Sequence, residues 1–180
     1  MIEARACGKV YIAGEYAVVL NKPAIIAPIK KYLTIKITPS EEYYLQRNNH
    51  PKVSFVLENK HQDNIFIIET LNWFNQYLAE NNLPIQKFII TISSELDDNN
   101  AKLGFGSSAA VTIALLKCLF KYYKIKYHEM MLYKAGVMIQ LRISKHSSYG
   151  DLACIAFAKV ILYQKFNHEV IGLINNISIN

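Results

Sequence analysis

The sequence predicts an α+β fold in which helices pack against a mixed or antiparallel sheet. The first observation is the order of its segments, which read as strands, a helix, a strand, two helices, a short helix and a strand, without regular strand–helix alternation. The second is the composition: 52% hydrophobic and 19% charged residues are typical of a globular chain. The third is the length, since 180 residues accommodate one domain and part of a second.

The first part of the chain shows the alternation and turn signals of extended structure. A run of β-branched, aromatic and small residues predicts two extended pieces with a turn near Gly14, and apolar–polar alternation predicts a half-buried strand farther along. The turn signal Asn21-Lys22-Pro23 lies between them. Residues 41–51 are expected to form a loop or hairpin tip. The expected extended segments are residues 6–20, 24–27, 32–38 and 52–57.

Apolar residues at helical spacing predict the helices of the later part of the chain. Asn64 or Asp63 is a candidate N-cap for the first of them. A strand over residues 88–92 precedes a polar loop over 93–102, and a strand over 160–163 follows the last helix. The predicted helices are residues 64–81, 107–123, 126–142 and 151–158.

Composition and cysteine spacing argue against several classes of protein. Cys7, Cys118 and Cys154 are far apart and odd in number, so we expect buried thiols in a reducing cytoplasm, with no disulfide framework or zinc site. Early charged residues argue against a signal peptide, and no apolar run approaches the roughly 20 residues that cross a membrane. Because 20 Lys and Arg face 14 Asp and Glu, the net charge is +6, which favours anionic ligands of any kind.

Residues 103–110, Leu-Gly-Phe-Gly-Ser-Ser-Ala-Ala, stand directly before a predicted apolar helix. Glycines let a backbone approach a ligand closely, and the backbone N–H groups at a helix start bind phosphate. The segment is not a Walker A loop, because no Gly-Lys-Ser/Thr follows, and Ala109 stands where a G-x-S-x-G motif needs its last glycine. It is a candidate phosphate loop; taken alone, a glycine turn with a serine cap explains it equally well.

A cation and an acid interrupt the apolar N-terminal region. Lys9 and Glu15 flank a run of mostly apolar residues that ends at Gly14. Because an unpaired buried charge is costly, both side chains need a partner or a ligand. The sequence leaves open whether Lys9 and Glu15 form a structural ion pair or contribute to a site.

A third polar segment, Ser147-Ser148-Tyr149-Gly150-Asp151, lies at the start of the last predicted helix. A carboxylate there is stabilised by the helix dipole, and Asp151 taken alone is an ordinary N-cap. Together with a strand-borne Lys and a Gly-Ser-Ser helix start, it provides the groups that phosphoryl transfer requires. These are donors for the phosphates, a Mg²⁺ ligand and a group that orients the acceptor.

The three segments resemble the motifs of the GHMP kinases, the family of galactokinase, homoserine kinase, mevalonate kinase and phosphomevalonate kinase. The family's first motif is similar to K-x-x-x-x-G-E-H or K-x-x-x-x-G-E-Y, its second to G-L-G-S-S-A or G-F-G-S-S-A, and its catalytic Asp lies in a Ser- and Gly-rich stretch. The sequence matches all three in order within residues 5–166. The resemblance implies the family's N-terminal domain, which is similar to domain 2 of ribosomal protein S5, with ATP and Mg²⁺ as cofactors.

Within the family, the triplet Gly14-Glu15-Tyr16 and the run over residues 150–156 resemble the bacterial phosphomevalonate kinases. This resemblance implies ATP-dependent phosphorylation of phosphomevalonate to diphosphomevalonate, in the mevalonate route to isoprenoids. The second phosphate pKa of about 6 leaves such an acceptor largely ionised near pH 7, so we expect positioning to matter more than strong base catalysis.

The resemblance also assigns roles residue by residue. Asp151 matches the catalytic Asp, Lys9 matches a Lys that neutralises charge near the transferred group, and Ser108 matches a Mg²⁺ ligand. Asn99 and Lys102 are candidate nucleotide contacts, although solvated loop residues would look the same. The phosphate loop matches Gly104, Gly106, Ser107, Ser108 and Ala109, and the candidate acceptor contacts are Glu15, Tyr16, Ser147 and Ser148.

Two features depart from the family. Mevalonate kinases have a further acidic Mg²⁺ ligand upstream of the catalytic Asp, whereas residues 138–145 contain no carboxylate. Family members are also much longer, with a second domain and a third glycine-rich motif that nothing here matches. We therefore expect residues 1–166 to form the ATP-binding domain and residues 167–180 to begin a truncated or missing C-terminal domain. The sequence leaves open whether that domain is lost, cut away or supplied by a separate chain.

Three alternatives stay open at the level of sequence. The first is a mevalonate kinase or another GHMP small-molecule kinase. The second is a non-catalytic fragment or one half of a split enzyme. The third is a nucleic-acid-binding module, which the net charge and the likeness to a ribosomal protein domain allow; scattered basic residues without an aromatic stacking motif argue against it. We expect a small-molecule substrate, with no nucleic acid or membrane partner.

Overall fold

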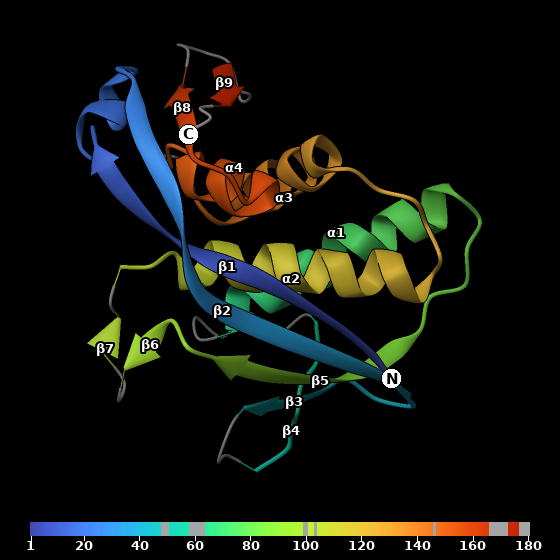
Figure 1. The fold of residues 1–180 in the computed structure, drawn as a ribbon. Coiled ribbons are helices and arrows are strands. Elements are labelled where there is room, and N and C mark those ends of the chain that lie inside the picture. The colour runs from blue at the N-terminus through green and yellow to red at the C-terminus, as the bar shows by residue number, and fades with distance from the viewer. Residues whose placement is uncertain are drawn as a thin grey trace.

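The computed structural model describes residues 1–47, 51–57, 64–98, 101–102, 104–145, 147–165 and 173–176. Within them, four α-helices pack on a mixed seven-stranded sheet, which confirms the predicted α+β fold (Figure 1). The strands of the sheet are β1 (Ile2–Ala13), β2 (Ala24–Ser40), β3 (Tyr44–Arg47), β4 (Val53–Ser54), β5 (Lys87–Ser94), β8 (Ile161–Gln164) and β9 (Leu173–Asn176). The helices are α1 (Ile65–Glu80), α2 (Ser107–Tyr122), α3 (Glu129–Ile143) and α4 (Gly150–Phe157).

β2 is the central strand of the sheet. β1 runs antiparallel along its whole length, from Ile2 opposite Ile37 to Ala13 opposite Ile25. On the other edge of β2, β5 pairs with the C-terminal half and β8 with the N-terminal end, both antiparallel, and the parallel pairing of β3 with β5 makes the sheet mixed. The end of β1 and β8 therefore flank the start of β2, although they are far apart in the sequence (Figure 1).

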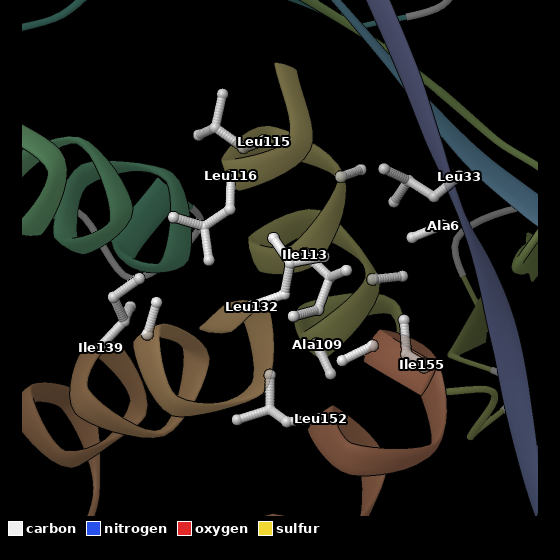
Figure 2. Close-up of a cluster of buried hydrophobic side chains, with 14 of the residues drawn as sticks. Ala6, Leu33, Ala109, Ile113, Leu115, Leu116, Leu132, Ile139, Leu152 and Ile155 are labelled. Atoms are coloured by element: carbon white, nitrogen blue, oxygen red, sulfur yellow. The ribbon is translucent and has the colours of Figure 1, made fainter. Parts of the chain in front are cut away.

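α2 is the central helix of the core. It is apolar nearly all round, as expected of a helix that is buried on every side. It packs on β1 and β2 and against the other three helices. Figure 2 shows its side chains between those of the sheet and those of the neighbouring helices. The labelled contacts include Ala6 and Leu33 from the sheet, Leu132 and Ile139 from α3, and Leu152 and Ile155 from α4.

The structure corrects several predicted strands. The second extended piece after Gly14 is wrong, because Ala17–Leu20 form a 3₁₀ helix, η1. The strands predicted over 24–27 and 32–38 are one strand, because the pairing with β1 continues through a two-residue bulge: Cys7 pairs with Tyr32 and the next residue with Ile29.

The remaining differences concern the short strands. β3 lies within the expected loop over 41–51, and only Val53–Ser54 of the predicted strand 52–57 pair with a neighbour. The expected polar loop over 93–102 contains the last two residues of β5 and a two-stranded hairpin, β6 (Asp97–Asp98) and β7 (Ala101–Lys102).

The predicted helices are confirmed to within a few residues at each end. Asn64 occupies the N-cap position of α1 but makes no side-chain capping bond, and Asp63 lies outside the described residues. All three cysteines are buried and free, as expected. Among the residues that the structure describes, no helix has the length and apolar character needed to span a bilayer.

Candidate active site

The N-terminus of α2 is held against β1 by its glycine loop. The Lys9 backbone N–H donates to the Phe105 carbonyl over 2.9 Å. Gly106 is the N-cap of α2, with φ +80°, and a Cβ there would lie 3.0 Å from Lys9 Cγ and 3.2 Å from Ile155 Cδ1. Both the backbone conformation and the close packing therefore require glycine at this position. Neither serine caps the helix through its side chain, so the serine-cap alternative is not supported.

Lys9 and Asp151 meet beside this helix start. Lys9 Nζ lies 3.3 Å from Asp151 Oδ2, and the Lys9 side chain is 6% exposed whereas that of Asp151 is 35% exposed. The structure therefore pairs Lys9 with Asp151, and the alternative of a Lys9–Glu15 pair is not what it shows. Asp151 belongs to the first turn of α4, and the cap position is occupied by Tyr149, so the N-cap alternative for Asp151 is wrong.

The loop before Asp151 is fixed by bonds from two other elements. Tyr163 of β8 donates its hydroxyl to the Ser148 carbonyl over 2.6 Å, and Lys165 Nζ donates to the Ser147 carbonyl over 2.8 Å. Tyr149 has φ +62°, which is strained for a residue with a side chain, and its buried ring lies under Lys165 Nζ at 4.8 Å. These contacts hold the chain in the conformation that turns Asp151 toward Lys9.

A cleft of about 440 Å³ connects the three predicted segments. It is lined by most of the predicted site residues: Lys9, Glu15, Gly104, Gly106, Ser107, Ser108, Ala109, Ser147, Ser148 and Asp151. Tyr16 is not part of this lining and is 85% exposed. Asn99 lies outside the described residues, and Lys102 belongs to β7, where only the backbone is described.

Four further residues line the cleft that sequence reasoning did not place there: Phe66, Gln140, Tyr149 and Leu152. Gln140 of α3 comes from the segment that lacks the acidic residue expected of a mevalonate kinase, so a neutral amide lines the cleft there instead. The position of Gln140 among the apolar residues of α3 gives no signal in the sequence that its side chain lines the cleft. Phe66 comes from the first turn of α1, where it reads as an ordinary core residue.

The polar groups of the cleft fit a Mg²⁺ ion that arrives together with a phosphate ligand. Magnesium prefers oxygen ligands and usually keeps several waters, with one or two protein groups and the phosphates completing its shell. The cleft offers the Ser108 hydroxyl and the Asp151 carboxylate. Across the described ranges, no group of three or more His, Cys, Asp and Glu side chains forms a dedicated metal cage. This donor set therefore suits an ion held mainly by phosphate.

Burial dominates the ionisation of the groups around the pair. Burial raises the pKa of the Tyr11 phenol, and the negative charge of Asp151 raises it further. Burial likewise raises the pKa of the Cys154 thiol to about 12, so that this thiol on α4 stays protonated. In this cleft, Asp151 and Lys9 form an ion pair, and the neighbouring phenol and thiol are neutral.

Comparison with known proteins gives one family and several relatives. Residues 66–159 match the family described as GHMP kinases, N-terminal domain. The phosphomevalonate kinase of Streptomyces sp. (strain CL190) is 21% identical, over 88% of this chain and 48% of its own length. The mevalonate kinase of Methanocaldococcus jannaschii is 28% identical, over 85% of this chain and 51% of its own length.

Solved structures agree with these relatives. The Streptococcus pneumoniae phosphomevalonate kinase in complex with phosphomevalonate and AMPPNP superimposes with a TM-score of 0.84 at 30% identity. The match covers 93% of this chain and 50% of that one. The chain thus spans about half the length of the relatives that it matches.

Proposed function

The chain belongs to the GHMP kinase family, and on that premise we propose that it takes part in ATP-dependent phosphorylation of phosphomevalonate. The observation that carries the proposal is the Lys9–Asp151 pair, which lies in one cleft with the glycine loop at the start of α2. The two phosphomevalonate kinases among the relatives support this acceptor, and the mevalonate kinase keeps mevalonate as the second candidate.

In the proposed reaction, an oxygen of the acceptor phosphate bonds to the γ-phosphorus of ATP while the bond from that phosphorus to the bridging oxygen breaks, releasing ADP. The loop from Gly104 to Ala109 would bind the nucleotide phosphates through backbone N–H groups. Ser108, with water and phosphate, would hold Mg²⁺, which neutralises charge on the phosphates when it is bound.

Lys9 and Asp151 have complementary tasks in this proposal. The Lys9 ammonium would stabilise the negative charge of the transferred group, and Asp151 would keep the ammonium in place and orient the acceptor. An acceptor phosphate is already largely ionised near pH 7, so Asp151 acts chiefly by positioning. Of the four candidate acceptor contacts, Glu15, Ser147 and Ser148 line the same cleft and are kept in this proposal.

We also propose that a second domain, on this polypeptide or a separate chain, completes the cleft. The coverage of about half of each relative supports this, since the matched relatives are about twice as long as the matched region. Of the residues 167–180 that were expected to begin that domain, Leu173–Asn176 form β9 and pair with β8 in the sheet described above. Without that second domain, the chain would then bind ATP and Mg²⁺ but turn over slowly.

The test is ADP release by the purified 180-residue chain with Mg-ATP and either phosphomevalonate, mevalonate or no acceptor. Release that depends on phosphomevalonate supports the proposed acceptor, and release that depends on mevalonate replaces it. No release with either acceptor, in the presence of measurable ATP binding, supports the proposal that a second domain is needed for turnover. No ATP binding contradicts the proposal for this chain.

A further inference from the structure

Tyr11 lies next to the Lys9–Asp151 pair but is not among the residues that line the cleft. We propose that Tyr11 is a positioning residue that fixes these two side chains relative to each other. Its ring would hold the ammonium and its hydroxyl would hold the carboxylate. The kinetic consequence rests on the proposed function, whereas the contact itself does not.

The ring of Tyr11 faces the lysine. Lys9 Nζ lies 4.6 Å from the ring centroid, and its side chain is almost fully buried. A buried ammonium over the face of an aromatic ring is attracted by the ring's negative face, and more strongly when water is excluded. Lys9 and Tyr11 are two residues apart in β1, so their side chains leave the same face of the strand. The ring therefore acts as a second partner for the charge that Asp151 neutralises.

The hydroxyl of Tyr11 faces the aspartate and the loop before it. Tyr11 Oη lies 3.3 Å from Ser148 Oγ, which itself accepts the Gly150 N–H at 3.4 Å. A phenol has one proton to donate and can accept another. A hydrogen bond to Asp151 is among the causes that raise the Tyr11 pKa, behind burial and the charge of Asp151. The Tyr11 hydroxyl would then donate to Asp151 and accept from the Ser148 hydroxyl, while Ser148 Oγ accepts from the Gly150 N–H.

The surrounding structure leaves room for this hydroxyl. A Cβ at Gly150 would lie 2.9 Å from Tyr11 Oη and 2.7 Å from Ile26 Cδ1, so any larger residue would displace the phenol. The partner loop is itself fixed, because Tyr163 holds the Ser148 carbonyl at 2.6 Å. Tyr11 thus links β1, which provides Lys9, to the loop and helix that provide Asp151.

The first experiment compares Tyr11→Phe, which removes only the hydroxyl, with the control Tyr43→Phe. Tyr43 is buried, whereas Tyr11 is partly buried, and the Tyr43 hydroxyl also makes hydrogen bonds, donating to the Gln86 carbonyl and accepting from the Asn75 amide, but Tyr43 does not line the cleft. We expect Y11F to lower kcat about tenfold while the KM values for ATP and acceptor change less than about twofold. Y43F should leave kcat unchanged. A raised KM with an unchanged kcat, or equal effects of Y11F and Y43F, would overturn the positioning role.

The second experiment needs no turnover. Urea unfolding of wild type, Y11F, D151N and the double variant forms a double-mutant cycle. We expect Y11F to lower the folding equilibrium constant at least about threefold more in the wild-type background than in D151N, because the charged acceptor is replaced there by a neutral amide oxygen, which accepts a weaker hydrogen bond. The cycle of Y43F with D151N should be additive. Additivity of Y11F with D151N would overturn the contact.

The two experiments separate the two proposals. If the wild-type chain neither binds ATP nor releases ADP with any acceptor, the proposed function fails for this chain, and the unfolding cycle still decides whether Tyr11 and Asp151 interact. If turnover is normal and the cycle is additive, the proposed function stands and the positioning role of Tyr11 is rejected.

Discussion

The two ends of α2 differ in what surrounds them. At its N-terminus the helix meets a glycine loop, a buried lysine and an open cleft. At its C-terminus, Phe120 is fully buried among aromatic rings, with centroid distances of 5.2 Å to Phe74, 5.9 Å to Tyr77 and 5.5 Å to Tyr127. One helix thus connects a polar, open end with a close-packed aromatic end.

The polar end of α2 contains the groups on which the proposed function depends, whereas the aromatic end contributes mainly to stability. The N-terminal end contains features that cost free energy, namely a non-glycine residue at positive φ, Tyr149, and the buried charge of Lys9. The aromatic end contributes apolar burial and edge-to-face ring contacts, which stabilise without any chemical role. Changes at the first end should therefore affect turnover more than unfolding, and changes at the second end the reverse.

The largest effect should come from Asp151→Asn, which keeps the size of the side chain and removes its charge. We expect turnover to fall by about 10²–10⁴-fold, because Lys9 and the acceptor lose the group that orients them. The chain should stay folded, as judged by its circular dichroism spectrum. The control is E42Q, which breaks a Lys–Glu pair of similar length, 3.2 Å, on the exposed surface. Comparable activity of D151N and E42Q would contradict the assigned role.

The next effect tests the glycine loop. Gly106→Ala combines an unfavourable positive φ with a Cβ placed 3.0 Å from Lys9 Cγ, whereas Gly104→Ala has a similar φ of +72° and nothing within 4 Å. Each should lose about 1–2 kcal/mol of stability from the backbone. G106A should also raise the KM for ATP about tenfold, clearly more than G104A does, because only the Cβ of G106A displaces Lys9. Equal KM values for the two variants would show that the contact between residue 106 and Lys9 does not affect the KM for ATP.

A smaller effect is expected at the aromatic end. Phe120→Leu keeps an apolar side chain but loses three ring contacts, and we expect a loss of about 1–1.5 kcal/mol in the free energy of unfolding. The kcat of the folded protein should not change. Urea unfolding and steady-state kinetics on the same preparation check both statements. A kcat reduced severalfold in fully folded F120L would mean that the two ends are coupled through α2.

Local motifs predicted well which residues meet at the polar end of this comparison. The glycine loop, Lys9 and Asp151 each follow from residue type and spacing within a short segment, and the structure places all three around one cleft. Tyr11 was missed, although its signal was present, since alternation in a strand puts residues 9 and 11 on one face. Its contact with Ser148, by contrast, joins residues far apart in the sequence and depends on how β1 and α4 meet.

The strands show where sequence reasoning fails. Separate strands were predicted over 24–27 and 32–38, but Lys30 and Lys31 form a bulge between them, and the backbone pairing with β1 continues on both sides. The stretch after Gly14 is apolar and partly β-branched, yet Val18 bonds back to the Gly14 carbonyl and a 3₁₀ turn forms. In both places, hydrogen bonding and packing decide the structure, and local propensity does not.

The smallest effect is expected from a comparison of two adjacent serines in the glycine loop. Ser108 and Ser107 are adjacent and both line the cleft, but only Ser108 is expected to bind Mg²⁺. Ser108→Ala should therefore raise the Mg²⁺ concentration for half-maximal activity about threefold, since water can replace one of several oxygen ligands at modest cost. Ser107→Ala should leave the metal titration unchanged, and neither variant should alter unfolding. A Mg²⁺ titration of both variants at saturating ATP is decisive: a shift in S107A without one in S108A would transfer the metal contact to the neighbouring serine.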